Sequence, residues 1–329
     1  MNGMKQINLQ DYGLNRNFIT QSMEYHDLYL ARIISQEKNF YQAVCVNGVL
    51  FAEVSGKLRF EATIQSDFPT VGDFVMLDRC NNKNGNAIIH HVLHRKSLFV
   101  RKAAGKVNEE QVVAANIDIV FLCMSLNKDF NIHRLERYLS LTWESGAIPV
   151  VVLTKSDLCD NVYRKLQVVN SIALGVDVVV TSSIEPDGYK QISKYIKPGC
   201  TVALLGSSGV GKSSLINCLM GGEFLNTKEI RIDDDKGRHA TTRRELFLIS
   251  GGGIVIDTPG MRELGMWDVS EGLDKSFADI EAYFGKCHFR NCTHTSEPGC
   301  AIWEAIAHQE LSPKRWESYR RLKTEAVFA

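Results

Sequence analysis

The 329-residue sequence has no long hydrophobic run, no excess charge of either sign and no low-complexity tract, and it contains only seven prolines. A membrane helix needs about 20 consecutive apolar residues, whereas the longest apolar runs here, such as residues 117–124, are far shorter. The first residues, among them Lys5 and Asp11, lack the apolar core of a secretory signal. These absences argue against a membrane-spanning, collagen-like or wholly disordered chain. They predict a cytoplasmic protein without membrane contact.

The balanced net charge hides unequal parts of the chain. Residues 1–106 carry a net charge of +4, residues 107–285 carry −6, and residues 286–329 carry +2. Basic ends are typical of surfaces that meet a polyanion such as nucleic acid, although differences of this size also occur on ordinary solvated surfaces.

Short strand-like runs separated by turn residues occupy the first third of the chain. These runs are residues 42–46, 49–54, 73–78 and 87–92. Strands this short and evenly spaced predict a small OB-like β-barrel over residues 29–100, with a β-sandwich as the alternative. Residues 1–28 are predicted to be an N-terminal extension.

Beyond residue 100, nearly continuous apolar strands alternate with amphipathic stretches. The strands are residues 117–124, 150–154, 176–181, 202–206 and 254–257, and the amphipathic stretches are residues 132–144, 163–173 and 212–219. This alternation predicts an α/β domain over residues 101–266, with a parallel sheet covered on both faces. Residues 267–329 are predicted to be helical, with a helix that begins at Ser312 and Pro313.

A complete phosphate-binding loop, GxxxxGK[ST], lies between the strand at 202–206 and the helix at 212–219. Backbone N–H groups of such a loop face the phosphates. Lys212 is expected to reach the β- and γ-phosphates, in a catalytic role, and Ser213 to hold Mg²⁺. The predicted phosphate-binding residues are Gly206, Ser207, Ser208, Gly209, Val210, Gly211, Lys212, Ser213 and Ser214.

Two loops that follow other strands favour GTP over ATP. The first consists of Thr154, Lys155, Ser156 and Asp157, and the second of Thr181, Ser182 and Ser183. The carboxylate of Asp157 can accept hydrogen bonds from both guanine N1–H and the 2-amino group, a donor pair that adenine lacks. Thr154 stands where most GTPases have Asn, and its hydroxyl can still bridge loops. The second loop fits a backbone contact to guanine O6.

Two further segments fit GTPase switch regions. Asp257 begins a DxxG sequence that ends at Gly260, and we expect Asp257 to bind Mg²⁺ through water and the Gly260 N–H to sense the γ-phosphate. In the polar segment 236–242, Thr242 is the preferred Mg²⁺ ligand and Thr241 the alternative. The guanine loops precede the phosphate loop, the reverse of the ordinary order, which predicts a circularly permuted P-loop GTPase domain.

Three cysteines and one histidine lie within fourteen residues near the end of the chain, and they are Cys287, Cys292, His294 and Cys300. This set matches a closed, structural Cys₃His zinc site. Such a site folds a segment too small to bury its own core. The other six cysteines are scattered, and we interpret them as reduced side chains, several of them small hydrophobic members of apolar runs. They are Cys45, Cys80, Cys123, Cys159, Cys200 and Cys218.

A basic stretch without acidic residues, residues 90–106, surrounds Phe99. Basic residues interleaved with an aromatic ring fit neutralisation of an RNA backbone together with base stacking, and a solvated linker is the alternative. The candidate RNA contacts are Arg95, Lys96, Arg101 and Lys102. The basic residues of the helix segment 315–323 are a weaker second candidate.

The barrel, the permuted motif order, the sequence GRHATT at residues 237–242 and the spacing C-x4-C-x-H-x5-C make this chain resemble the ribosome small-subunit-dependent GTPase A family. The resemblance covers nearly the whole chain from about residue 29. It implies an OB-fold, a permuted GTPase domain and an α-helical zinc-binding domain. It also implies a role in late maturation of the small (30S) ribosomal subunit, which stimulates GTP hydrolysis, and contact with ribosomal RNA near the decoding region.

Two departures bear on catalysis. Ala240 stands where relatives often have a Thr, which moves the Mg²⁺ role to Thr241 or Thr242. Met261 follows Gly260, where many GTPases have the glutamine that orients water, so slow intrinsic turnover is expected. The resemblance suggests His239 as the residue that positions this water, and groups supplied by the ribosome are the alternative.

The sequence therefore predicts a monomeric GTP hydrolase that binds GTP and GDP, Mg²⁺, one zinc ion, the 30S subunit and its rRNA. Three alternatives stay open. They are a translation- or tRNA-associated GTPase, an RNA-binding protein in which GTP is structural, and a phosphate-loop kinase that acts on a small metabolite.

Overall fold

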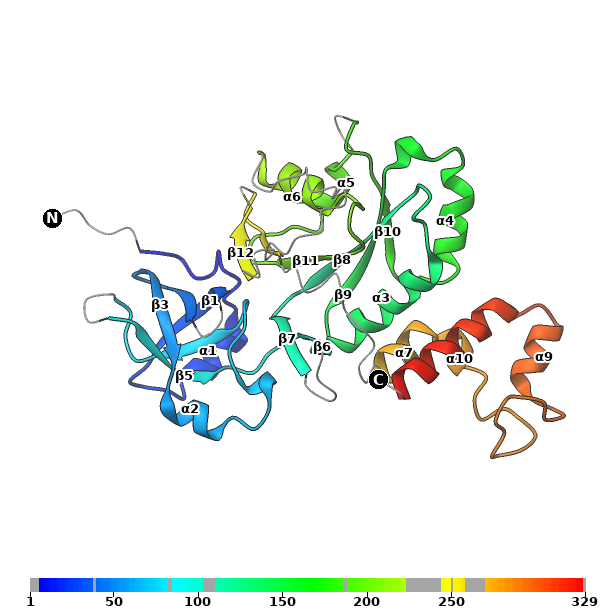
Figure 1. The fold of residues 1–329 in the computed structure, drawn as a ribbon, viewed down its shortest axis with the longest axis horizontal. Helices are drawn as coiled ribbons and strands as arrows, with labels where there is room; N and C mark the ends of the chain where they lie inside the picture. Colours follow the sequence, from blue (N-terminus) through cyan, green and yellow to red (C-terminus); the bar gives the residue numbers. More distant parts are fainter. Residues whose placement is uncertain are drawn as a thin grey trace, which may run out of the picture.

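The computed structural model describes residues 6–37, 40–81, 85–102, 110–185, 188–222, 244–249, 251–257 and 270–327. Figure 1 shows a β-barrel and a group of carboxy-terminal helices at opposite ends of a central α/β sheet. Among the residues described, no helix combines the length and the apolar character needed to cross a membrane.

Five strands close the barrel. They are β1 (Tyr29–Glu37), β2 (Phe40–Cys45), β3 (Gly48–Val54), β4 (Phe74–Leu77) and β5 (Ala87–Val92). Strand β1 pairs with both β2 and β4, while β3 and β4 both pair with β5. The ring is therefore closed, which confirms the OB-like barrel and excludes the sandwich. Small and branched side chains such as Ala43, Leu50 and Val75 fill its interior.

The segment before β1 packs against the barrel. Helix α1 (Arg16–Ser22) begins after Asn15, whose side chain accepts hydrogen bonds from two backbone N–H groups of the first turn. Its buried Phe18 lies with its ring centroid 4.2 Å from that of Phe74 in β4. Helix α2 (Gly56–Glu61) and the short 3₁₀ helix η1 (Gln65–Asp67) connect β3 to β4.

One prediction about the cysteines is wrong. Cys45 at the end of β2 and Cys80 after β4 form a disulfide, with Cα atoms 6.2 Å apart. They are 35 residues apart in sequence, and only barrel closure brings them together. Cys123, by contrast, is a buried free thiol, as interpreted from the sequence. Burial raises the pKa of Cys123 to about 12, so this thiol stays protonated and inert at neutral pH.

The central sheet has the order β10-β9-β8-β11-β13-β12. Its strands are β8 (Ile119–Ser125), β9 (Ile148–Thr154), β10 (Asp177–Val180), β11 (Thr201–Leu205), β12 (Arg244–Leu248) and β13 (Ile254–Asp257), parallel except for β12. One core lies against α3 (Ile132–Glu144) and α4 (Val162–Asn170), and the other against α5 (Lys190–Ser193) and α6 (Lys212–Met220). The sheet covered on both faces is thus confirmed.

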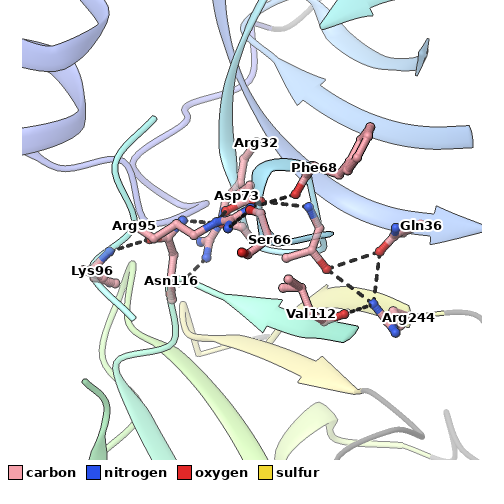
Figure 2. Close-up of polar contacts among 12 residues, drawn as sticks. Arg32, Gln36, Ser66, Phe68, Asp73, Arg95, Lys96, Val112, Asn116 and Arg244 are labelled. Atoms are coloured by element: carbon pink, nitrogen blue, oxygen red, sulfur yellow. Dashed lines mark hydrogen bonds and ion pairs between the residues drawn. The ribbon is translucent and has the colours of Figure 1, made fainter. Parts of the chain in front are cut away.

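Barrel and central sheet form one continuous eleven-stranded sheet, because β12 pairs with β1 through Gln36 and Arg244. Figure 2 shows the polar contacts at this junction. Arg244 donates to the side-chain oxygen of Gln36 and to the carbonyl of Val112. Val112 lies in β7 (Glu110–Ala115), which pairs with β6 (Leu98–Lys102) as a two-stranded sheet.

A buried arginine adds a second link across this junction. Arg32 of β1 is 1% exposed and donates to the carbonyls of Tyr12 and Gly72 and to the hydroxyl of Thr201 in β11. Its guanidinium lies 5.0 Å from the centre of the Phe74 ring. Burial lowers the pKa of Arg32 to about 10, so the side chain remains charged at neutral pH.

Four helices form the carboxy-terminal part, and they are α7 (Ser270–Ser276), α8 (Ala278–Glu281), α9 (Ala301–Ala307) and α10 (Pro313–Val327). The predicted start of α10 is confirmed, and its apolar face of Trp316, Tyr319 and Leu322 is buried. The prediction that the basic residues of segment 315–323 contact RNA does not hold for Arg315, which is 6% exposed. It pairs with Glu136 of α3 and Asp279 of α8, so it is excluded as an RNA contact.

Replacing Arg315 by Ala should lower the free energy of unfolding by about 3–5 kcal/mol, because Glu136 would remain buried without its cation. The side chain of Glu136 is only 2% exposed. Arg137→Ala is the matched control, since Arg137 joins the same two helices through Glu325 but both side chains are more than a third exposed. The Arg137→Ala control should lower the free energy of unfolding by about 1 kcal/mol or less. Equal losses in urea-induced unfolding would contradict this assignment.

Candidate nucleotide-binding site and metal centre

The predicted phosphate loop connects β11 to α6 at the carboxyl edge of the central sheet. A Cβ atom at Gly206 would lie 2.5 Å from the backbone oxygen of Cys123, so only glycine fits there. Gly211 has φ of +104°, a backbone conformation that favours glycine. Helix α6 begins directly at Lys212, so its first N–H groups face the loop, as anion binding requires.

Side chains of this loop are held by neighbouring groups. The Lys212 ammonium donates to the backbone carbonyls of Gly206 and Ser207 at 2.5 and 2.6 Å. The Ser207 hydroxyl donates to the Asp129 carboxylate at 2.6 Å, and Asp129 also pairs with Arg134 of α3. Asp129 and Arg134 were missed by the sequence reasoning. The signal available was that Asp129 follows β8, the strand next to β11, so it lies at the same edge of the sheet.

The first guanine loop touches the phosphate loop through two side chains. The Thr154 hydroxyl donates to the carbonyl of Val210 at 2.6 Å, so it makes the bridge considered for it from the sequence. The Lys155 ammonium donates to the carbonyl of Gly209 at 2.7 Å. Lys155 has φ of +56°, an unfavourable conformation for a residue with a Cβ that is concentrated at functional sites.

The two guanine loops also meet each other. The Ser182 hydroxyl donates to Asp157 Oδ1 at 2.6 Å, which fixes the orientation of the carboxylate. Ser156 donates its backbone N–H to the carbonyl of Thr181. A Cβ atom at Gly188 would lie 1.9 Å from the carbonyl oxygen of Ser182, so this glycine is needed for the second loop to fold back. Gly188 was not anticipated from the sequence.

Two oxygen-bearing side chains that the sequence analysis predicts as Mg²⁺ ligands lie at the same edge. Ser213 is in the first turn of α6, and Asp257 ends β13, which pairs in parallel with β11. A hydroxyl and a carboxylate are the donor types that Mg²⁺ takes. His239, Thr241, Thr242, Gly260 and Met261 lie outside the described residues.

The Cys/His residues predicted from the sequence come together as one cluster. The ligand atoms of Cys287, Cys292, His294 and Cys300 all lie within 4.8 Å of one another. His294 Nδ1 is 3.4 Å from the sulfur atoms of both Cys287 and Cys300. A tetrahedral zinc site with ordinary bond lengths has ligand–ligand edges of about 3.5–3.8 Å. The cluster therefore fits a tetrahedral metal ion.

We expect Cys292→Ser to reduce the bound metal to well below one equivalent and to unfold the loop between α8 and α9, because structural metal binding and local folding are the same event. Metal content is measured by elemental analysis, and folding by resistance to proteolysis around residues 285–300. Cys159→Ser is the control, since Cys159 is a free cysteine outside the cluster. Full metal content in the Cys292 variant would contradict the ligand assignment.

The candidate RNA contacts around residue 95 are in part wrong. Arg95 is 13% exposed and pairs with the fully buried carboxylate of Asp73. It also donates to the backbone carbonyls of Ser66 and Phe68, as Figure 2 shows. Arg95 is therefore an internal cation and not an RNA contact, although the sequence pattern placed it in a solvent-facing run.

The other candidates of that run have different surroundings. Lys96 forms an ion pair with Asp118, and its side chain is 28% exposed. Arg101 and Lys102 are at the end of β6, and their side chains lie outside what the structure describes. Among the candidates whose side chains the structure describes, Lys96 is therefore the one that stays partly exposed.

Comparison with known proteins identifies sequences and structures similar to this chain. The sequence model of the RsgA GTPase family matches residues 92–267. The chain is 44% identical to the small ribosomal subunit biogenesis GTPase RsgA 2 of Lactiplantibacillus plantarum, over 98% of this chain and 90% of that protein. It is 41% identical to the small ribosomal subunit biogenesis GTPase RsgA of Methanosarcina acetivorans, over 96% of this chain and 85% of that protein.

Two solved structures share the fold. YjeQ from Thermotoga maritima matches with a TM-score of 0.66 and 26% identity, over 91% of this chain and 99% of that one. YloQ, a circularly permuted GTPase, matches with a TM-score of 0.64 and 26% identity, over 92% and 96% of the two chains. The permuted GTPase fold predicted from the motif order is confirmed. This chain belongs to the RsgA GTPase family.

Proposed function

We propose that this protein hydrolyses GTP and acts in the biogenesis of the small (30S) ribosomal subunit. The observation that carries the nucleotide assignment is the meeting of three loops that are far apart in sequence. Thr154 and Lys155 contact the phosphate loop, and Ser182 orients the carboxylate of Asp157. Relatives that share about 40% identity over nearly the whole chain, and are named small ribosomal subunit biogenesis GTPases, support the biological role.

In the proposed site, the loop 206–214 holds the phosphates and Asp157 accepts the two guanine donors. The second guanine loop, residues 181–183, contacts guanine O6. Lys212 turns from its backbone carbonyls to the β- and γ-phosphates. Mg²⁺, when bound, neutralises charge on those phosphates, and Ser213, Thr242 and Asp257 would hold it.

The catalytic step needs a positioned water. His239 is proposed to orient it, and Gly260 to sense the γ-phosphate through its N–H.

The remaining proposals concern the rest of the molecule. We propose zinc as the ion of the Cys₃His cluster, where it would hold the loop between α8 and α9. The proposed division of the chain is an extension (1–28), a barrel (29–100), a GTPase domain (101–266) and a zinc-binding domain (267–329). A monomeric, cytoplasmic protein is proposed, with ribosomal RNA contacted through Lys96, Arg101 and Lys102.

The decisive experiment measures GTP turnover by the protein alone, with small ribosomal subunits, and with large subunits, with ATP as the control nucleotide. We expect slow turnover of GTP alone, a steep rise with small subunits, and no hydrolysis of ATP. A rate that is unchanged by every particle would refute the role on the small subunit. Hydrolysis of ATP at the same rate would refute the guanine assignment.

A further inference from the structure

The short loop that joins β8 to α3 lies beside the phosphate loop, and its own hydrogen bonds fix its shape. Leu126 donates its backbone N–H to the carbonyl of Thr154 at 2.8 Å. The Asn127 side chain accepts hydrogen bonds from the Ser125 hydroxyl and the Asp129 N–H, at 2.8 and 3.0 Å. The backbone of Asp129 is therefore held at the edge of the sheet where the phosphate loop begins.

The carboxylate of Asp129 joins this loop to the phosphate loop. Its Oδ2 atom accepts the Ser207 hydroxyl at 2.6 Å. Arg134, in the first turn of α3, donates to the same carboxylate through two nitrogen atoms, with Nη1 2.9 Å from Oδ2 and Nη2 3.2 Å from Oδ1. Such two-point contacts fix the orientation of a carboxylate. Ser207, Asp129 and Arg134 thus form one connected group, which we call the loop clamp.

The loop clamp places a negative charge next to the loop that is proposed to hold the phosphates. The hydrogen bond from Arg134 is the main cause that lowers the pKa of Asp129, so this carboxylate is ionised at neutral pH. An uncompensated carboxylate at this position would repel a nucleoside triphosphate, because charges interact over about 8 Å at physiological salt. The guanidinium of Arg134 cancels the charge.

The surroundings of this ion pair argue against a role in folding alone. The side chains of Arg134 and Asp129 are 28% and 42% exposed, and exposed ion pairs contribute little to stability. Helix α3 is also capped independently, since the Asn131 side chain accepts the Arg134 N–H at 3.0 Å. The helix therefore does not need the ion pair in order to begin.

We propose that Asp129 and Arg134 are positioning residues for GTP. Asp129 fixes the phosphate loop through the Ser207 hydroxyl, and Arg134 cancels the charge of Asp129 so that the loop still accepts the phosphates. Neither of these two side chains contacts the nucleotide itself. The inference rests on the proposed function, because it takes the phosphate loop to bind GTP, and it adds two residues that lie outside the nucleotide-binding motifs.

The first test measures the affinity of the full, metal-loaded chain for GTP, by competition with a fluorescent GTP analogue in the presence of Mg²⁺. Arg134→Ala leaves the carboxylate of Asp129 without its cation, so GTP should bind at least about fivefold more weakly. Arg137→Ala is the matched control, because Arg137 lies one turn later on α3 and pairs with Glu325. The control should change the affinity for GTP less than twofold.

A double variant separates charge cancellation from direct contact with the nucleotide. Asparagine at position 129 can still accept the Ser207 hydroxyl but carries no charge. Asp129→Asn combined with Arg134→Ala should therefore return the affinity for GTP to within twofold of the unaltered protein. A double variant that binds as weakly as Arg134→Ala would overturn the charge cancellation, because Arg134 would then contact the nucleotide itself.

The contact between Asp129 and the phosphate loop is tested through GTP turnover. Ser207→Ala and Asp129→Ala should each lower kcat by about three- to tenfold, because each removes the hydrogen bond that fixes the loop. The two substitutions together should lower kcat no further than either one alone, since both remove the same bond. Losses that multiply in the double variant would overturn this part of the loop clamp.

These outcomes separate the loop clamp from the proposed function. If the unaltered protein binds GTP but Arg134→Ala and Arg137→Ala bind it alike, only the loop clamp fails. If the variants differ as expected but small subunits leave GTP turnover unchanged, the loop clamp stands and the role on the subunit fails. An unaltered protein that binds no GTP would overturn both.

Discussion

Lys212→Ala should reduce GTP turnover by at least about 10²–10³-fold, the loss expected when one strong donor to the transferring phosphoryl group is removed. In the structure the Lys212 ammonium is held within the phosphate loop by the carbonyls of Gly206 and Ser207. These contacts keep the charge beside the position where the phosphates would bind. Alanine removes that charge and leaves the glycine-rich backbone in place, so the loop is expected to keep its shape.

Turnover of radiolabelled GTP and binding of a fluorescent GTP analogue would be measured for the same preparations. Lys194→Ala is a suitable control, because Lys194 directly follows helix α5, outside the phosphate loop, and lies above the ring of Tyr195. The GTP turnover of the Lys194 variant should match that of the unaltered protein. Normal GTP turnover in the Lys212 variant would contradict the role of the phosphate loop in the reaction, and it would also contradict the proposed GTPase activity.

Asp157→Asn should convert the preference for GTP into a preference for xanthosine triphosphate. The carboxylate is proposed to accept two guanine N–H donors, and charge-assisted hydrogen bonds contribute about 1.5–3 kcal/mol each. An asparagine presents one donor to the guanine 2-amino group, which is itself a donor, so GTP affinity should fall by about 10²–10³-fold. Xanthine has a carbonyl at that position and can accept the amide N–H.

Competition between GTP and xanthosine triphosphate in one binding assay gives the ratio of the two affinities directly. Asp160→Asn is the control, because Asp160 is exposed on the segment that follows the same loop. Its ratio should equal that of the unaltered protein. An unchanged ratio in the Asp157 variant would mean that this carboxylate does not read the base, despite its hydrogen bond from Ser182.

The parts of this site that could be predicted from the sequence are those set by local spacing. The phosphate loop, the two guanine loops and the Cys/His cluster are each contained within a few residues, and the strands before them are strongly apolar. Their contacts with one another followed from the general rule that parallel strands end at one edge of a sheet. Gly188 and Asp129 were missed because nothing in their own surroundings indicates which loop folds against them.

Long-range pairing explains the predictions that were wrong. Arg95 lies in a basic run that reads as solvated, yet its partner Asp73 is 22 residues earlier and faces it only after the barrel closes. Cys45 and Cys80 meet for the same reason. On α10, Arg315 and Arg320 look alike in sequence, but one faces α3 and the other faces solvent. A helix carries charge on several faces, and only its neighbours decide which face is covered.

The pairing of β12 with β1 also has a consequence for solubility. The antiparallel strand β12 is the last strand of the central sheet. Without the barrel, the backbone N–H and C=O groups at the start of β12, on the side away from β13, would be unpaired. Such an edge is a template for pairing between molecules. The barrel covers it through the register of Ser35 with Glu245 and Gln36 with Arg244. A shortened chain that keeps the central sheet but lacks the barrel is therefore expected to self-associate through β12, so the barrel also protects the GTPase sheet from aggregation.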